Sequence, residues 1–245
     1  MKTPDVALVV GAGDSLGSAL ARRFAREGLK VCVARRNADK LAPLVGSIRG
    51  SGGTVHPFGC DARREEQVVE LFAKIERDVG ALEIVVFNVG GNIYFKLVET
   101  TAQKYFKAWE MACFAGFLTA REAMKHMAPR ARGTLFFTGA TAGLRGAEGY
   151  AAFATGKFGL RALAQSTARE FGRQGIHVAH VVIDGPIDTP FVRERFPDLV
   201  KERPADGLLQ PDDIADTYWA IHRQKRSAWT FEADVRPWVE PLTTF

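Results

Sequence analysis

A glycine-rich turn between a short apolar strand and a helix constrains the fold of this chain more than any other feature. The β-branched run Val6–Val10 is followed by Gly11-Ala12-Gly13-Asp14-Ser15-Leu16-Gly17, and apolar residues then recur at helical spacing from Leu16 to Phe24. Short apolar runs and amphipathic helical patterns continue to alternate along the chain. This alternation is typical of strands that are buried on both faces and joined by helical crossovers.

The periodicity predicts the elements of an α/β fold. The predicted strands cover residues 6–10, 30–34, 54–58, 84–88, 134–138, 177–183 and 229–235. The predicted helices cover residues 16–27, 39–50, 64–79, 104–127, 150–173 and 211–222. We therefore expect a single doubly wound, Rossmann-like parallel sheet of about seven strands with helices on both faces. It should form one domain over residues 1–245, with a substrate lid around residues 190–209.

Composition excludes several classes of protein. Hydrophobic residues make up 47% and charged residues 25% of the chain, which is typical of a globular domain rather than a disordered one. The net charge of +5 comes without a basic stripe, so we expect no nucleic-acid partner. No apolar run approaches the roughly 20 residues of a membrane span, and the first one is too short for a signal peptide. The scattered histidines predict no metal site, and Cys32, Cys60 and Cys113 form no CxxC pair, which favours the cytoplasm.

The glycine turn also suggests a ligand. Glycines allow the main chain to approach a pyrophosphate, and the following helix start offers free N–H groups. A glycine run alone can be merely a tight turn, but its position after the first strand predicts a dinucleotide site. The residues expected there are Gly11, Gly13, Ser15, Leu16 and Gly17.

Motifs over nearly the whole chain resemble the short-chain dehydrogenase/reductase family. Residues 10–17 resemble its TGxxxGxG loop, with Val10 and Ser15 as departures. Phe87-Asn88-Val89-Gly90 resembles its NNAG motif, and Asp184-Gly185-Pro186-Ile187-Asp188-Thr189 is similar to its PGxxxT segment. Gln210-Pro211-Asp212-Asp213-Ile214-Ala215 also follows a family pattern. The resemblance implies further cofactor contacts at Asp61, Ala62, Asn88, Val89, Gly90, Lys157, Gly185, Ile187 and Thr189.

The end of the second predicted strand bears on which nicotinamide cofactor is bound. An acidic residue there suits the ribose of NAD, and an arginine suits the 2′-phosphate of NADP. Here the strand ends in Ala34-Arg35-Arg36-Asn37, with Arg35 at the family's usual acidic position. Because guanidinium groups pair well with phosphate, we expect NADP(H) in preference to NAD(H). The alternative is that Arg35 and Arg36 are solvated residues at a helix start.

The catalytic positions implied by the resemblance are mostly altered. The family uses a Tyr, a Lys, a Ser and an Asn for hydride chemistry. Lys157 matches the Lys, whereas the Tyr, Ser and Asn positions hold Phe153, Ala140 and Cys113. Phenylalanine has no proton to give and alanine has no hydroxyl, so the usual mechanism is not expected. Cys113 is interpreted as a small buried hydrophobe rather than a nucleophile.

Three hydroxyl groups could compensate. Tyr150 lies seven residues before Lys157, which returns to nearly the same helix face. This spacing is similar to that of the enoyl-thioester reductases, where the Tyr stabilises an enolate, although that branch usually has Ser where this chain has Gly17. Tyr150 is otherwise a packing or cleft-lining aromatic. Thr138 and Thr141 are weaker candidates for the lost Ser, and their alternative roles are as strand and loop residues.

Two functions remain open. The first is an NADP(H)-dependent oxidoreductase with a non-standard active site, reducing an activated C=C or C=O bond of a small apolar substrate. Apolar residues of the lid, Phe191, Phe196, Leu208 and Leu209, favour such a substrate. The alternative is a catalytically inactive NADP(H)-binding protein that serves as a sensor, a scaffold or an inactive partner subunit. Residues 104–127 and 150–173 resemble helices that pair subunits in this family, so a homodimer or homotetramer is expected.

Overall fold

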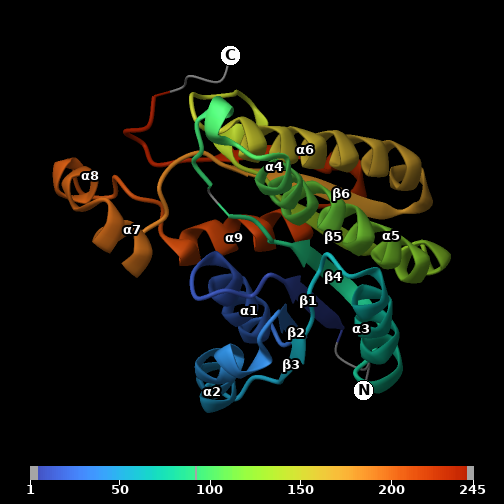
Figure 1. Cartoon of the computed structure of the whole chain (residues 1–245). Coiled ribbons are helices and arrows are strands. Elements are labelled where there is room, and N and C mark those ends of the chain that lie inside the picture. The colour runs from blue at the N-terminus through green and yellow to red at the C-terminus, as the bar shows by residue number, and fades with distance from the viewer. Residues whose placement is uncertain (1–4, 92, 242–245) are drawn as a thin grey trace.

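All seven strands lie in one parallel sheet, in the order β3-β2-β1-β4-β5-β6-β7 (Figure 1). The computed structural model describes residues 5–91 and 93–241, so the expected domain limits 1 and 245 lie outside the described residues. The strands are β1 Val6–Val10, β2 Lys30–Arg35, β3 Val55–Gly59, β4 Leu82–Phe87, β5 Gly133–Thr138, β6 Ile176–Ile183 and β7 Glu232–Val235. The predicted doubly wound sheet is confirmed, and the last strand is shorter than predicted.

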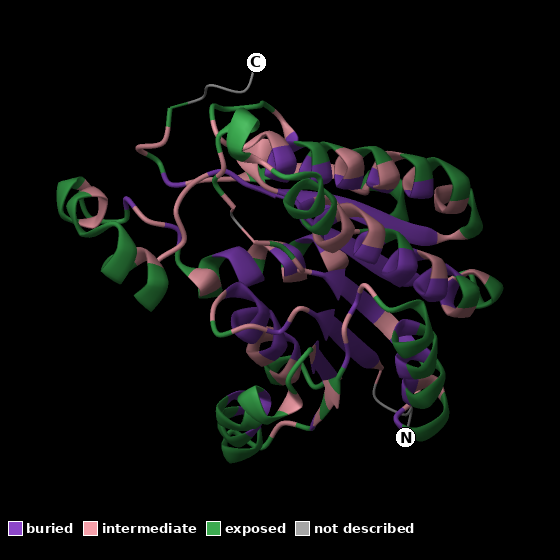
Figure 2. Ribbon diagram, in the orientation of Figure 1, coloured by how far each residue is buried: buried purple, intermediate pink, exposed green. Residues whose placement is uncertain are grey.

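Helices cover both faces of the sheet, whose inner strands are almost wholly buried, while the edge strands β3 and β7 are partly exposed (Figure 2). One face packs against α1 Leu16–Arg26, α2 Ala42–Gly50 and α9 Pro211–His222. The other packs against α3 Glu65–Asp78, α5 Ala115–Met127 and α6 Ala151–Phe171. Single-turn 3₁₀ segments occur at Ala38–Leu41, Leu97–Glu99, Ala128–Arg130, Thr141–Gly143, Gly172–Gln174 and Arg226–Ala228. Successive residues of a strand point to opposite faces of the sheet and pack into two separate cores. Because both faces are buried, the strand sequences are unbroken apolar runs.

The chain reverses direction across the sheet at β1. This strand pairs with β2 on one side and with β4 on the other. The connections leaving β1 and β4 therefore diverge, which leaves a crevice at the carboxyl ends of the central strands. The glycine turn lies at this reversal.

Two segments differ from the helices that the periodicity predicts. The predicted helix 104–127 consists of α4 Ala102–Trp109, a wider π turn at Glu110–Phe114, and α5. A Cβ placed on Gly156 of α6 would lie 2.9 Å from the Cβ of Ala112, so α6 packs tightly against this turn. The segment 190–209, predicted as a lid and called the lid segment below, contains two short helices, α7 Pro190–Arg195 and α8 Pro197–Glu202, which extend to the left of the sheet in Figure 1. Helices of six residues carry too little periodicity to be recognised.

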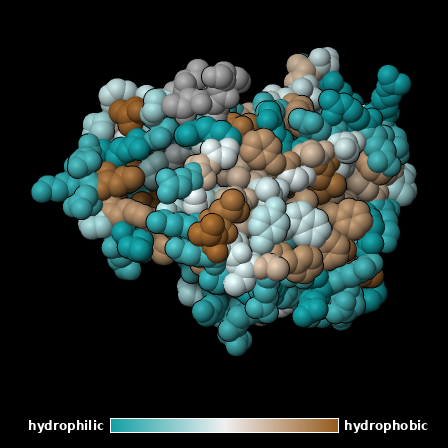
Figure 3. Space-filling view, turned by 45° about the horizontal axis from the view of Figure 1, so that its top comes forward, coloured by the Kyte–Doolittle hydropathy of each residue, from teal (hydrophilic) through white to brown (hydrophobic). Residues whose placement is uncertain are grey.

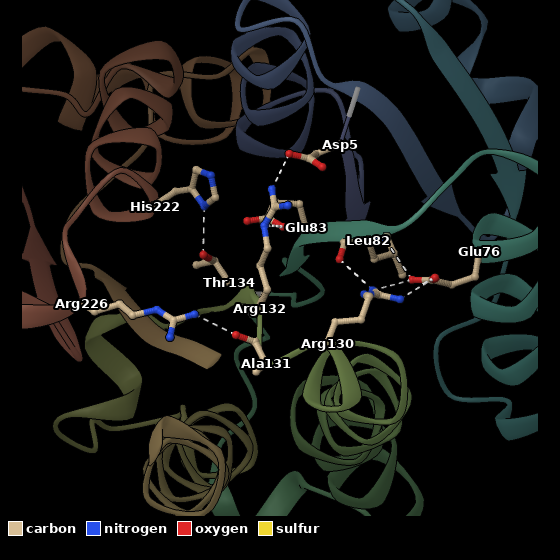
Figure 4. A network of polar contacts seen from close by, with 10 residues as sticks. All are labelled: Asp5, Glu76, Leu82, Glu83, Arg130, Ala131, Arg132, Thr134, His222 and Arg226. Atoms are coloured by element: carbon tan, nitrogen blue, oxygen red, sulfur yellow. Dashed lines mark hydrogen bonds and ion pairs between the residues drawn. The ribbon is translucent and has the colours of Figure 1, made fainter. Parts of the chain in front are cut away.

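The amino ends of the strands are joined by a polar network (Figure 4). Arg132 pairs with Asp5 before β1 and with Glu83 of β4, while Arg130 pairs with Glu76 of α3. His222 at the end of α9 shares a 2.9 Å hydrogen bond with Thr134 of β5. This network lies at the edge of the sheet opposite the crevice, so its role is structural. None of the helices in the described ranges is long and apolar enough to cross a membrane.

Candidate active-site cleft

A cleft of about 750 Å³ opens at the carboxyl ends of the central strands. Its floor comes from the residues that follow β1, β4, β5 and β6, and the lid helices α7 and α8 form one wall. Among the described residues that line it, the charged ones are Asp14, Arg145 and Lys157. The cleft therefore occupies the position where doubly wound sheets bind ligands.

Two glycines of the turn, Gly11 and Gly17, pack against main-chain atoms that leave no room for a side chain. Gly11 has a φ of +91°, and a Cβ there would lie 2.7 Å from the carbonyl oxygen of Asn88. A Cβ on Gly17 would lie 2.5 Å from the carbonyl oxygen of Gly11. Gly13 differs, because a Cβ there would meet nothing within 4 Å. Gly11 and Gly17 thus allow the turn to pack, whereas Gly13 leaves space on the cleft side.

The start of α1 is prepared for an anion. Its first turn contains no acidic residue, and Ser15 makes no side-chain cap bond to it. The turn is held from behind, because Ser18 Oγ donates to the Gly13 carbonyl at 2.6 Å and Asn88 Nδ2 donates to the Gly11 carbonyl at 3.1 Å. The Ser18 N–H is bonded to the carbonyls of Gly13 and Ser15, whereas the N–H groups ahead of it have no side-chain cap and have the helix dipole behind them.

Basic residues lie beyond the glycine turn, outside the residues that line the cleft. Arg35, at the end of β2, donates hydrogen bonds of 3.2 Å to Asp14 and to the carbonyl of Lys40. Arg36 is exposed. Asp61 makes a bidentate pair with Arg63, which holds the pKa of Asp61 below its ordinary value. Asp61, Ala62 and Val89 also lie outside the lining residues.

Lys157 is the buried cation of the cleft. Its side chain is 4% exposed, and its Nζ donates to the carbonyl oxygen of Thr138 at 2.9 Å. Burial lowers the pKa of Lys157 to about 8. A Cβ on Gly90 would lie 3.1 Å from this Nζ, so the main chain after β4 passes directly over the ammonium group.

The predicted catalytic positions do not all meet at the cleft. Phe153, Ala140 and Tyr150 line it together with Lys157, and the Phe153 ring centre is 5.9 Å from Nζ. Tyr150 is the residue that precedes α6, and its ring contacts Tyr94 edge-on at 5.4 Å. Cys113 lies in the π turn outside the lining residues; a Cβ on Gly159 of α6 would lie 2.8 Å from its Sγ.

Two threonine hydroxyls are already engaged. Thr138 Oγ1 is 2.9 Å from the hydroxyl of Tyr218 on α9, and both side chains are buried. Thr141 lines the cleft and donates a short hydrogen bond of 2.5 Å to Asp184. In the sequence Asp184 is recognisable only as part of a motif, because its partner lies 43 positions away. One feature of the sequence could have drawn attention to Asp184: it is an acidic residue at the position where the PGxxxT segment of the family has proline.

The lid side of the cleft is apolar. Phe191, Val192, Phe196 and Leu199 line this wall. Leu208 and Leu209 do not line the cleft, and Leu209 is buried in the core behind it. In Figure 3, brown apolar side chains gather toward the left, where the lid helices lie, and across the middle of the face. The PGxxxT-like residues Gly185, Ile187 and Thr189 also line the cleft, and Thr189 caps α7.

The described residues contain no group of three His, Cys, Asp or Glu side chains that could hold a metal ion.

Comparison with known proteins places this architecture in a family. A family model described as short chain dehydrogenase matches residues 5–199. The 3-oxoacyl-[acyl-carrier-protein] reductase MabA of Mycobacterium tuberculosis is 31% identical over 205 residues, which are 83% of this chain and 75% of MabA. A crystal structure of a short-chain dehydrogenase from Rhodopseudomonas palustris is 43% identical with a TM-score of 0.83, covering 96% of this chain and 99% of that one. A metagenomic short-chain oxidoreductase in complex with NADP shares the fold at 24% identity, with a TM-score of 0.82 and coverage of 95% and 97%. The chain belongs to the short-chain dehydrogenase family of oxidoreductases.

Proposed function

We propose that this protein is an NADP(H)-dependent oxidoreductase with a non-standard active site, which reduces an activated C=C or C=O bond of a small apolar substrate. The observation that carries the proposal is Lys157, which is buried in the same cleft as the glycine turn and as Phe153 and Ala140, the residues that the sequence motifs match to the family's Tyr and Ser. On this proposal the chain keeps the residues that would hold the cofactor and lacks the usual proton donor.

The residues of the cleft fit a dinucleotide. The open side of Gly13 and the uncapped start of α1 suit a pyrophosphate, which would accept hydrogen bonds from main-chain N–H groups. Lys157 donates one hydrogen bond to Thr138, and its remaining N–H groups can hold ribose hydroxyls. When bound, the nicotinamide supplies or accepts a hydride.

The choice of NADP(H) rests on Arg35 and Arg36. Arg35 is held by Asp14 and by the carbonyl of Lys40, which orients its guanidinium beside the glycine turn. Arg36 is exposed and lies close enough to Asp61 to lower the pKa of that carboxyl. Two guanidinium groups at the end of β2 suit a 2′-phosphate. The metagenomic oxidoreductase, a relative in fold, was crystallised with NADP.

The reacting group would lie among Tyr150, Lys157 and the apolar lid. The phenol of Tyr150 can donate a hydrogen bond to an oxyanion that forms as hydride adds to the substrate. Lys157 stabilises negative charge in the same cleft. Phe153 and Ala140 contribute only shape, and the lid residues Phe191 and Phe196 exclude water from an apolar ligand.

An inactive cofactor-binding protein is the second candidate, and the phenylalanine at position 153 favours it. A titration with NADPH and NADH tests the part common to both functions, with tighter binding of NADPH expected. NADPH oxidation is then followed with crotonyl-thioester and with cyclohexanone. Turnover of either compound supports the enzyme. Binding of NADPH without turnover of either compound supports the second candidate, and a failure to bind either cofactor contradicts both.

We also propose a homodimer or homotetramer formed through α4, α5 and α6. The exposed aromatic residues on these helices are Tyr105, Phe106, Phe117 and Phe158. A groove of about 420 Å³ runs between α5 and α6 beside Phe117. Exposed aromatic side chains are typical of interfaces. The cysteines are free and Cys32 and Cys60 are buried, which fits the cytoplasm that we propose as the location.

A further inference from the structure

Thr141 and Asp184 form a polar pair at the wall of the cleft. Thr141 begins the turn that follows β5, and Asp184 directly follows β6, so the two neighbouring parallel strands bring them together. The Thr141 hydroxyl donates to Oδ1 of Asp184 at 2.5 Å. Thr141 lines the cleft, whereas Asp184 lies behind it and is 2% exposed.

The carboxyl group of Asp184 is incompletely satisfied. Its Oδ2 is buried and has no hydrogen-bond partner within residues 5–91 and 93–241. A second carboxyl group lies nearby on β7: burial and the charge of Asp184 raise the pKa of Asp234, and Arg236 just after β7 acts on Asp234 in the opposite direction. A buried carboxylate with a single hydrogen-bond donor costs stability, and such groups are found where chemistry or binding requires them.

The direction of this hydrogen bond decides what Thr141 can offer to a ligand. A hydroxyl has one proton and two lone pairs. Because the proton of Thr141 is directed to Asp184, only lone pairs remain for a ligand in the cleft. Tyr150, which lines the same cleft, can instead donate its phenolic proton.

We propose that Thr141 accepts a hydrogen bond from a substrate hydroxyl and that Asp184 is the proton acceptor behind it. This inference rests on the proposed redox function and narrows its substrate to a pair of alcohol and carbonyl compounds. In the oxidation direction, the substrate O–H bond breaks and its proton passes to Thr141 Oγ1. The proton of Thr141 passes to Oδ1 of Asp184, and the electron pair left on the substrate oxygen forms the C=O bond as hydride leaves for an oxidised nicotinamide. In the reduction direction every transfer is reversed.

The test measures ligand preference without turnover. Dissociation constants of cyclohexanol and cyclohexanone are compared by ligand-observed NMR on the full chain, with and without NADP⁺. One hydrogen bond of ordinary strength predicts that wild type binds the alcohol about five-fold more tightly than the ketone. Thr141→Val should reduce this ratio to about one, because valine keeps the shape and removes the acceptor.

Asp184→Asn gives the sharper result. The asparagine amide can donate to Thr141, whose own proton is then free to turn toward the cleft, so the preference should move to the ketone. Thr155→Val is the matched control, because Thr155 bonds to main-chain carbonyls of α6 outside the cleft lining. Thermal melts confirm that each variant is folded.

Equal or stronger binding of the ketone by wild type overturns the proposal, as does an unchanged ratio in Asp184→Asn or a failure of both compounds to bind. The proposed redox function fails separately, through absent cofactor binding or absent turnover.

Discussion

The ammonium of Lys157 donates to the main-chain carbonyl of Thr138 across 2.9 Å while its side chain is only 4% exposed. Burial lowers the pKa of this lysine to about 8. Near neutral pH the Lys157 side chain is therefore still charged, although its burial disfavours the charged form. A ligand-binding group that costs stability in this way is common in functional sites.

Replacing Lys157 with methionine should stabilise the protein and abolish its binding of NADPH. Between pH 8 and pH 10.5 the unfolded chain holds a proton that the folded chain has lost, so the contribution of Lys157 to stability rises with pH. We expect Lys157→Met to raise the free energy of unfolding by about 1–3 kcal/mol at pH 7, with the advantage shrinking above pH 8. Urea denaturation across this pH range measures it. Lys74→Met, at an exposed position, is the control, and a destabilised Lys157→Met would contradict the prediction.

Arg35→Ala should weaken NADPH binding by about 10- to 100-fold and leave NADH binding nearly unchanged, since a guanidinium–phosphate bond is charge-assisted. Asp14→Asn removes the carboxylate that Arg35 now contacts at 3.2 Å, and it should strengthen NADPH binding. Fluorescence titration with both cofactors measures the effects. Arg26→Ala, at the exposed end of α1, is the control. Equal losses for the two cofactors would show that Arg35 does not recognise the phosphate.

Phe153→Tyr combined with Ala140→Ser should increase the rate of reduction of simple ketones above that of wild type. Both positions line the cleft, and the Phe153 ring lies 5.9 Å from Lys157 Nζ, so a phenol there would come under the influence of the ammonium group. NADPH oxidation with cyclohexanone is the measurement. The same double variant carrying Lys157→Met is the control and should be inactive. If the double variant shows no gain over wild type, the cleft has diverged beyond these two positions.

Sequence patterns predicted the strands and the glycine turn because each depends on local periodicity or on one backbone requirement. Gly11 illustrates this: its positive φ and its contact with Asn88 permit only glycine, and that constraint is readable in the chain. The motifs also matched Lys157, Phe153 and Ala140 to the catalytic positions of the family, and all three residues line one cleft.

Side-chain pairing could not be predicted in the same way. The bonds from Thr141 to Asp184 and from Thr138 to Tyr218 join residues 43 and 80 positions apart, and they depend on how neighbouring strands and α9 are placed. Cys113, which the sequence predicts as a small buried hydrophobe, is only half-buried in the π turn, where a Cβ on Gly159 of α6 would lie 2.8 Å from its Sγ. Pairings of this kind follow from tertiary packing, which periodicity does not encode.

Phe117→Glu should convert the oligomer that we propose into monomers. Phe117 is 41% exposed on α5, where its ring stacks on Phe114 and lies under Arg121. A charge placed there would have to be desolvated in an interface between α5 helices, at a cost that pairing with Arg121 on the same helix offsets only in part. Sedimentation velocity measures the change. Val69→Glu on α3, where Val69 is 39% exposed, is the matched control. A wild-type chain that is already monomeric would refute the assembly.

Because of His222, the free energy of unfolding should be smaller in mild acid than at neutral pH. Burial, assisted by nearby positive charge, lowers the pKa of this histidine to about 4, and its ring is held by Thr134 at the amino edge of the sheet (Figure 4). The unfolded chain takes up the proton near pH 6.5 while the folded chain resists it, so stability falls as the pH drops from about 6.5 toward 4. The loss should approach about 3 kcal/mol for this one group.

His222→Gln isolates this effect, because the amide can still bond to Thr134 but does not titrate. His177 and His180 are also buried with lowered pKa values and contribute to the slope of the wild type. The informative quantity is therefore the difference between wild type and His222→Gln in urea denaturation at pH 7 and pH 4.5. We expect the variant to lose less stability than wild type over this range. His56→Gln, at a partly exposed position on β3, should change the slope much less. Parallel losses in wild type and His222→Gln would show that the buried ring is not the group that makes the fold sensitive to acid.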